Sequence, residues 1–126
     1  MNAYRAAGYA VAMDFVTNDA TSPLMDQLTA ISQTYVPGLA VGRNALGGGS
    51  SDHASFFRNG FPAVFYFEPV ARYSPFIHSA SDTLGTSAND LNQSLLITRS
   101  VLAGAAELAQ PLPVPAKKRI QCLPVA

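Results

Sequence analysis

The chain has 126 residues, a length that suits a single domain. Its apolar share of 48 % and charged share of 13 % exclude an intrinsically disordered chain, which combines low hydrophobicity with high net charge. The formal net charge of +0 leaves no broad basic face for a phosphate backbone, and no apolar run reaches the roughly 20 residues that span a bilayer. We therefore expect neither nucleic acid nor a membrane as a partner.

The first part of the chain predicts a strand, a helix and a second strand. Residues 8–17 form an apolar run that indicates a buried strand, with Asp14 near its C-terminal end. Ser22 suits a helix N-cap and Pro23 suits the first helical position, and a Pro-Gly pair ends the helix. The apolar face of this helix is expected to contain Leu24, Leu28, Ile31 and Tyr35. Residues 39–42 predict the second strand.

The middle of the chain predicts a short helix and a strong strand. A glycine-rich loop leads to Ser51 and Asp52, which suit the N-terminal cap of a helix that ends near residue 59. We expect both phenylalanines of this helix, Phe56 and Phe57, to point inward. Residues 62–67 are rich in aromatic and β-branched side chains and predict the strongest strand of the chain.

A long loop and a long helix follow. Residues 69–88 have no periodicity, and a loop of this length in a compact domain is often functional. Ser87 and Asp90 resemble a capping box at the start of a helix. The apolar face of that helix is expected to contain Leu91, Leu95, Thr98, Leu102, Ala105 and Ala109.

The alternation of strands and helices predicts an α/β fold, a partial three-layer sandwich with a mostly parallel sheet. Three strands are fewer than the usual five or six, so we expect the chain to continue a larger sheet whose N-terminal strands are missing. Residues 1–110 form the folded part, and residues 111–126 predict an unstructured, proline-rich and basic tail. The single cysteine, Cys122, lies in this tail. Because one thiol has no partner within the chain, it gives neither an internal disulfide nor a CxxC motif.

Two residues stand out as metal ligands. Asp14 is expected at the end of a strand, and His78 lies in the loop that follows the strongest strand. Zinc takes imidazole nitrogens and carboxylate oxygens, and sites in open α/β sheets lie beyond the carboxyl ends of the strands. The two side chains can therefore meet there. The alternatives are that Asp14 is a turn or cap residue, and that His78 binds a backbone carbonyl.

The sequence Ser51-Asp52-His53 resembles a hydrolase triad only superficially. The three groups of a triad must face each other in space, whereas adjacent residues at a helix start point in different directions. A serine hydrolase that uses Ser51 and His53 would also need a GxSxG elbow, which the sequence lacks. The better interpretation is that these residues cap a helix and anchor a loop.

Four blocks of the sequence together resemble one enzyme family. They are SDHxxF at residues 51–56, GxP at residues 60–62, a strand that ends at Glu68, and HxxxDT at residues 78–83. In this order and spacing they resemble the closing part of the M28 zinc exopeptidases, the family of secreted bacterial leucyl aminopeptidases. The strand that contains Asp14 also resembles a family strand, one that ends in a metal-binding Asp. The resemblance covers roughly residues 8 to 109.

The resemblance implies a two-zinc site of which this chain holds two ligands. Asp14 and His78 match one ligand of each zinc, whereas the family's general-base Glu and its other ligands lie upstream of the Asp14 strand. Ser51, Asp52 and His53 then form part of the site wall. Gly48 stands where some relatives place a Tyr that helps to polarise the substrate carbonyl, and a flanking cysteine pair is also replaced, by Leu46 and Ser50.

The resemblance also implies a reaction and a compartment. In an intact relative, zinc activates a water, a Glu moves its proton, and the N-terminal residue of a peptide substrate is released. The expected pocket for that residue contains Phe65, Phe67, Tyr73 and Phe76. The parent enzyme is expected to be secreted or periplasmic, and carboxypeptidase or glutaminyl-cyclase activity is an alternative within the family. By itself this fragment is expected to be inactive.

A second hypothesis needs no catalysis. The chain can instead be an interaction module that reuses half of the fold and forms a homodimer through an exposed sheet edge. Its oligomeric state separates the two hypotheses.

Overall fold

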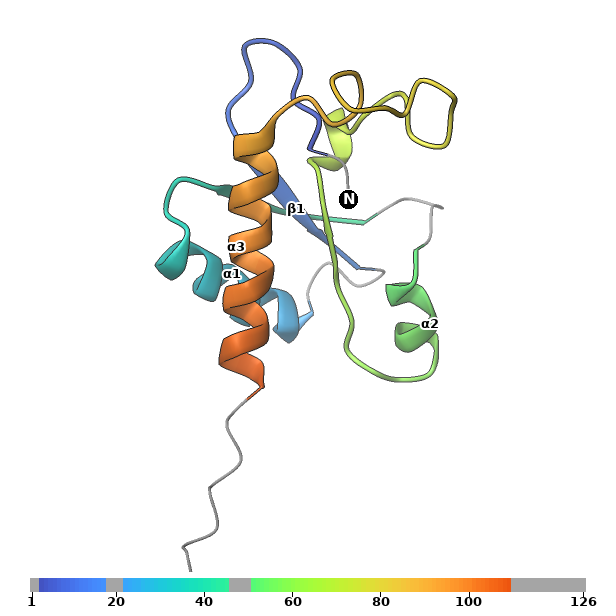
Figure 1. Cartoon of the computed structure of the whole chain (residues 1–126). Helices are drawn as coiled ribbons and strands as arrows, with labels where there is room; N and C mark the ends of the chain where they lie inside the picture. The colour runs from blue at the N-terminus through green and yellow to red at the C-terminus, as the bar shows by residue number, and fades with distance from the viewer. Residues whose placement is uncertain (1–2, 18–21, 46–50, 110–126) are drawn as a thin grey trace, which may run out of the picture.

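The computed structural model describes residues 3–17, 22–45 and 51–109; Gly48, Cys122 and the tail of residues 111–126 lie outside these ranges. The elements are, in chain order, β1 (Ala12–Val16), α1 (Pro23–Tyr35), β2 (Ala40–Asn44), α2 (His53–Arg58), β3 (Phe65–Phe67), the 3-10 helix η1 (Val70–Arg72) and α3 (Leu91–Leu108) (Figure 1). The predicted alternation of strands and helices is confirmed, although β3 is only half as long as expected.

The sheet is mixed, so the prediction of a mostly parallel sheet is not confirmed. Its strand order is β2-β1-β3, with β1 in the centre. β1 pairs with β2 in parallel, as a strand–helix–strand crossover requires, but β1 pairs with β3 antiparallel. In the second pairing Asp14 lies opposite Phe67 and Val16 lies opposite Phe65. The carboxyl ends of β1 and β3 therefore point to opposite ends of the sheet.

One face of the sheet packs against α1 and α3. Met13 and Phe15 alternate with Asp14 along β1, are fully buried, and join one apolar cluster with the two helices. That cluster contains Met13, Phe15, Met25, Leu28, Val36, Leu39 and Ile97. On the opposite face, the ring of His53 in the short helix α2 stacks on Phe65. A complete second helical layer is not present in the described residues, so the three-layer prediction is not confirmed.

α1 begins as the sequence predicts, with Ser22 as N-cap and Pro23 at the first helical position. It packs against α3 through small polar residues. The Ser32 hydroxyl lies 2.6 Å from the Ser100 hydroxyl, and both residues are buried. At Gly104 a Cβ atom would lie 2.6 Å from the Tyr66 hydroxyl oxygen, so only glycine fits there without a shift of its neighbours. The two helices approach closely because these side chains are small.

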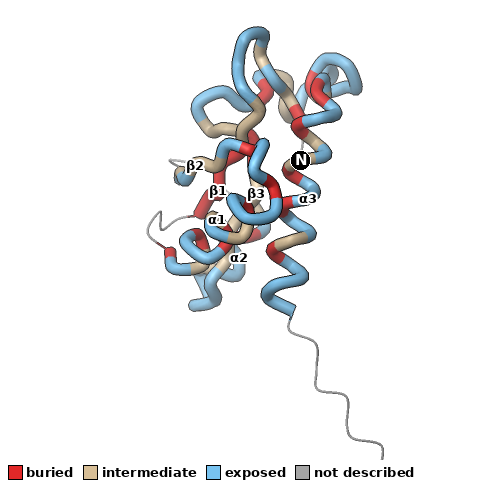
Figure 2. Tube along the Cα trace, turned by 90° about the vertical axis from the view of Figure 1, so that its left-hand side faces the viewer, coloured by how far each residue is buried: buried red, intermediate tan, exposed pale blue. Residues whose placement is uncertain are grey.

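The face of α3 that packs inward is not the leucine-rich face that the sequence predicts. The buried residues are Gln93, Ile97, Ser100 and Gly104. Leu91 and Leu102 are instead 81 % and 68 % exposed, and Leu95 is also exposed. Figure 2 shows this alternation of buried and exposed segments along the helix. The close approach of α1 and Tyr66 selects the small-residue face, and the leucines remain in solvent.

Two local predictions are also wrong. Asp90 alone is the N-cap of α3: its carboxylate accepts a hydrogen bond from the Gln93 N–H at 2.9 Å, while Ser87 binds Ser74 instead. In α2, Phe56 is 61 % exposed and does not point inward, because the short helix packs through His53 and Ala54.

Candidate functional site

Asp14 lies at the centre of β1, not at its C-terminal end as predicted. Its side chain is on the face opposite Met13 and Phe15 and is buried. Oδ2 accepts a hydrogen bond of 2.7 Å from the backbone N–H of Val70 and a long one of 3.5 Å from the Asn44 side chain. Within residues 3–17, 22–45 and 51–109, Oδ1 receives no hydrogen bond.

The carboxylate of Asp14 lies over the backbone of β2. At Gly42 a Cβ atom would come within 2.1 Å of Asp14 Oδ1 and 3.3 Å of Asp14 Cγ. The two residues are register partners in the parallel ladder. Glycine at this position therefore makes the space that the carboxylate occupies, which sequence reasoning did not single out.

A second buried carboxylate lies near Asp14. Glu68 directly follows β3 and is 1 % exposed. Its two oxygens accept hydrogen bonds of 2.8 Å each, from the backbone N–H groups of Tyr4 and Ser74. Burial raises the pKa of the Glu68 carboxyl, and the two amide hydrogen bonds oppose that rise. From the sequence, Glu68 is predicted only to end a strand.

His78 lies in an exposed loop whose base is closed. The Ser74 and Ser87 hydroxyls are 2.7 Å apart, and both residues are buried. His78 itself is exposed and has a φ of 63°, a left-handed conformation that is uncommon for a residue other than glycine. Within the described part of the chain, no hydrogen bond or ion pair joins His78 to Asp14. The structure does bring Asp14 to the start of this loop, through the Val70 N–H.

Three of the four predicted pocket residues form an aromatic row on the Asp14 face. The ring of His53 stacks on Phe65 at 5.7 Å, Phe65 lies 5.0 Å from Phe67, and Phe67 lies 5.6 Å from Tyr73. Phe65 and Phe67 share a face with Asp14 because they are register partners of Val16 and Asp14. Phe76 is not in this row.

Phe76 contacts Tyr4 instead, with an edge-on ring distance of 6.3 Å. It therefore helps to hold the N-terminal segment against the long loop. Its predicted place in a substrate pocket has no support from its contacts.

The three residues Ser51, Asp52 and His53 stand at the start of α2. Asp52 is the N-cap and is exposed, but its side chain makes no capping hydrogen bond. His53 is 6 % exposed, and burial lowers its pKa below the usual range, while the nearby Asp52 charge acts in the opposite direction. Its Nδ1 has no hydrogen-bond partner within the described ranges.

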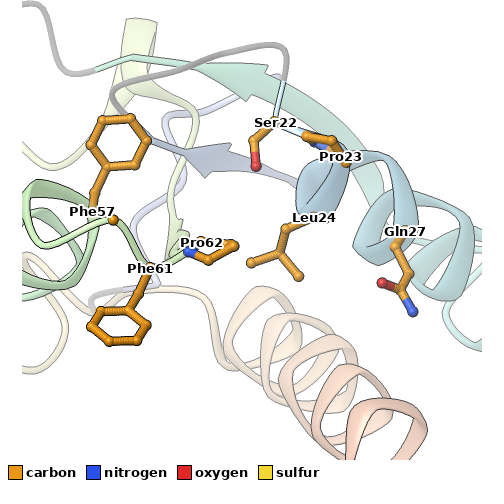
Figure 3. A pocket seen from close by; sticks show the side chains of 8 residues that line it. Ser22, Pro23, Leu24, Gln27, Phe57, Phe61 and Pro62 are labelled. Atoms are coloured by element: carbon orange, nitrogen blue, oxygen red, sulfur yellow. The ribbon is translucent and has the colours of Figure 1, made fainter.

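Two hollows lie near these elements. One, of about 520 Å³, is lined by the start of α1 and by the segment after α2. Figure 3 shows Leu24 pointing toward Pro62 in it, with Phe57 and Phe61 on the far side. A second, of about 480 Å³, lies between α2, β3 and α3, and Ser51, Asp52, His53 and Phe65 are among its lining residues. The first contains none of the predicted site residues.

The described residues alone do not make a zinc site. They contain no group of three or more His, Cys, Asp or Glu side chains placed to hold one metal ion. A tight zinc site usually has four ligands. Asp14 can offer its free Oδ1 and His78 can offer an exposed imidazole, so the chain contributes two ligands at most from the predicted set. Within the described ranges, no helix is both long and apolar enough to cross a membrane.

Comparisons with known proteins point to one family. The sequence model of peptidase family M28 matches residues 2–103. A crystal structure of the Legionella pneumophila LapA aminopeptidase is similar, with a TM-score of 0.71 and 28 % sequence identity over 82 % of this chain. A second crystal structure of Legionella LapA gives the same TM-score and identity over 81 % of this chain. In both cases the match covers 28 % of the aminopeptidase chain, so this chain spans little more than a quarter of its length.

Proposed function

The chain belongs to peptidase family M28, and we propose that it forms the C-terminal share of the catalytic domain of a zinc-dependent aminopeptidase. One observation carries the proposal. Asp14 is a buried carboxylate with one oxygen fixed by the Val70 N–H, while the other receives no hydrogen bond from the described residues and lies in a space that Gly42 provides. A free, oriented and desolvated carboxylate oxygen is what a metal ligand requires.

In this proposal Asp14 and His78 each hold one zinc ion, and residues outside this chain complete both sites. The aromatic row of Phe65, Phe67 and Tyr73 forms part of the wall for the N-terminal side chain of a peptide substrate. His53 supports the row by stacking on Phe65. A secreted or periplasmic parent is part of the same proposal.

The isolated chain is proposed to be inactive because neither of its glutamates is free to act as the general base. Its only two glutamates are Glu68 and Glu107. Both oxygens of Glu68 accept backbone N–H groups, and Glu107 accepts a hydrogen bond from the Tyr35 hydroxyl at the far end of α3. Neither carboxylate is available to take a proton from a water beside Asp14.

A zinc titration of the whole chain, followed by ¹⁵N chemical shifts, tests the proposal. We expect weak binding at two independent places, with the first lost in Asp14→Asn and the second lost in His78→Ala. Cys122→Ser is the background in which all variants are made, since a thiol also binds zinc. Absence of any shift at residues 14 and 78 at millimolar zinc would overturn the ligand assignment. Hydrolysis of leucyl anilides by this chain above the zinc blank would overturn its inactivity.

A non-catalytic interaction module is the second candidate. Two observations favour it: the exposed leucines of α3, and the hollow beside β3, which is an edge strand of the described sheet. Unpaired edge strands and exposed apolar patches are common sites of association. A monomer in sedimentation velocity at micromolar concentration excludes a stable homodimer.

A further inference from the structure

Glu68 is a buried carboxylate to which the proposed function gives no role in chemistry. Burial of an isolated carboxylate costs several kcal/mol in general, so one that persists at 1 % exposure must be hydrogen-bonded. Each of its oxygens accepts one backbone N–H, from Tyr4 and from Ser74. It therefore joins two segments that are 70 positions apart in the sequence to the end of β3.

The Ser74 bond fixes the base of the loop that carries His78. Ser74 donates its N–H to Glu68, and its hydroxyl pairs with that of Ser87 on the returning side of the loop. The same hydroxyl accepts the N–H of Phe76. The two ends of the loop of residues 74–87 thus meet at the Ser74–Ser87 pair. The carboxylate of Glu68 fixes the position of this pair through Ser74.

The hydrogen bond from the Tyr4 N–H to Glu68 connects the base of this loop to the N-terminal segment. The carbonyl of Ala3 accepts the N–H groups of Asn89 and Asp90, and Arg5 forms an ion pair of 2.5 Å with Asp90. The N-terminal segment is therefore attached to the start of α3 on one side and to Glu68 on the other. Between Glu68 and Ser74, Val70 donates its N–H to Asp14.

We propose that Glu68 is a positioning residue that holds the His78 loop in a fixed place relative to Asp14. Residues 68 to 74 connect the two sites: the Val70 N–H binds Asp14, and Ser74 holds the base of the His78 loop. This inference rests on the proposed function only for the ligand roles of Asp14 and His78. The ordering of the loop by Glu68 stands on hydrogen bonds alone.

A carboxylate is required at this position because two acceptors are needed. A glutamine has one carbonyl oxygen, and its NH₂ group is a donor that would face one of the two N–H groups. Leaving a buried donor without a partner costs more than the net worth of a typical hydrogen bond. Glu68→Gln therefore changes the hydrogen bonding with almost no change in volume.

Amide hydrogen exchange on the full chain, followed by NMR without metal, tests the proposal. In Glu68→Gln we expect the Tyr4 and Ser74 amides, and protected amides within residues 74–87, to exchange roughly tenfold faster than the shift in global stability explains. Ser100→Ala is the matched control, since it removes one buried hydroxyl pair between α1 and α3, far from the loop. The control should change the α1 and α3 amides and leave the loop unaffected.

A uniform change of exchange in Glu68→Gln, like that of a general loss of stability, would overturn the proposal. So would an unchanged loop. If Glu68→Gln does not fold, Glu68→Asp is the second variant, because it retains the charge on a shorter side chain. Its loop amides should exchange at a rate between those of the wild type and a loop without this anchor. Wild-type exchange in Glu68→Asp would also overturn the proposal. Faster loop exchange together with a failed zinc titration would support the positioning role of Glu68. It would overturn only the ligand roles of Asp14 and His78.

Discussion

The two faces of β1 are built by different kinds of interaction. On one face Met13 and Phe15 pack against α1 and α3 through apolar contacts that have no preferred direction. On the other face Asp14 binds a backbone amide of η1. Just beyond the neighbouring strand, Glu68 binds two more backbone amides. The first arrangement supplies stability in proportion to buried area, whereas the second places particular atoms.

Stability and positioning are therefore largely separate in this chain. Apolar side chains can shift by rotamer changes and still fill space. A hydrogen bond weakens steeply when its angle departs from linear, so a carboxylate bound to two amides fixes the loops that contain them. We therefore expect substitutions on the helix face to change the free energy of unfolding most, and substitutions on the Asp14 face to change local order.

The strongest loss of stability is expected on the face of β1 that packs against α1 and α3. Phe15→Ala should lower the free energy of unfolding by about 3–5 kcal/mol, since it leaves a cavity among fully buried neighbours. Urea denaturation followed by circular dichroism measures it. Met13→Leu is the control, because it nearly conserves volume and should cost less than about 1.5 kcal/mol. A Phe15→Ala variant within about 1 kcal/mol of wild type would show that this face is not the main source of stability.

The next effect is on the Asp14 face. Gly42→Ala places a methyl group where Asp14 Oδ1 lies, so the carboxylate must move and its bond to Val70 should weaken. We expect a loss of about 1–3 kcal/mol, with ¹⁵N shift changes concentrated at residues 14 and 70. Gly38→Ala is the matched control, since its Cβ would meet only Leu96 at 4.0 Å. Equal losses in both variants would mean that the space beside Asp14 does not depend on glycine at position 42.

A smaller effect concerns pH. Burial lowers the pKa of His53 in the folded state, so between that lowered pKa and the ordinary value near 6.5 the unfolded chain binds more protons. Stability should thus rise with pH through this window and fall as the pH drops from about 7 to 5. Denaturation curves measured at several pH values give the slope.

His53→Phe should reduce that slope, because it retains an aromatic ring against Phe65 and removes the titrating group. His78→Asn, which removes the other histidine from an exposed position, is the matched comparison. An unchanged slope in His53→Phe would show that His53 is not the source of the pH dependence.

The smallest effect is expected on the outer face of α3. Leu102→Gln should change the free energy of unfolding by no more than about 0.5 kcal/mol, since Leu102 is 68 % exposed. Ile97→Ala, on the buried face of the same helix, should cost about 2–5 kcal/mol by the same urea measurement. A large loss in Leu102→Gln would mean that the leucine row is covered in solution, which would favour self-association.

Local rules predicted much of the fold. The Ser22-Pro23 pair fixed the start of α1, because proline tolerates the first helical position and few others. The alternation of apolar runs gave the correct order of strands and helices. These signals lie within a few residues of the element that they specify. They can therefore be interpreted from a single sequence without knowledge of the packing.

The direction of β3 and the buried face of α3 could not be predicted in the same way. Leu91, Leu95 and Leu102 have helical spacing, but so do the buried Gln93, Ile97, Ser100 and Gly104. The choice depends on how closely α1 and Tyr66 approach, which is a property of packing. The same holds for Glu68 and Gly42, whose importance appears only when segments distant in sequence are brought together.

The left-handed backbone of His78 restricts which amino acids can replace it. With a φ of 63°, the position disfavours β-branched and bulky residues and tolerates Gly, Asn, Asp and His. Of these, His and Asp can bind zinc. Among natural or selected variants of this loop, exchange between His and Asp at position 78 therefore costs the backbone little, whereas Val, Ile or Thr there would force the loop to change its path.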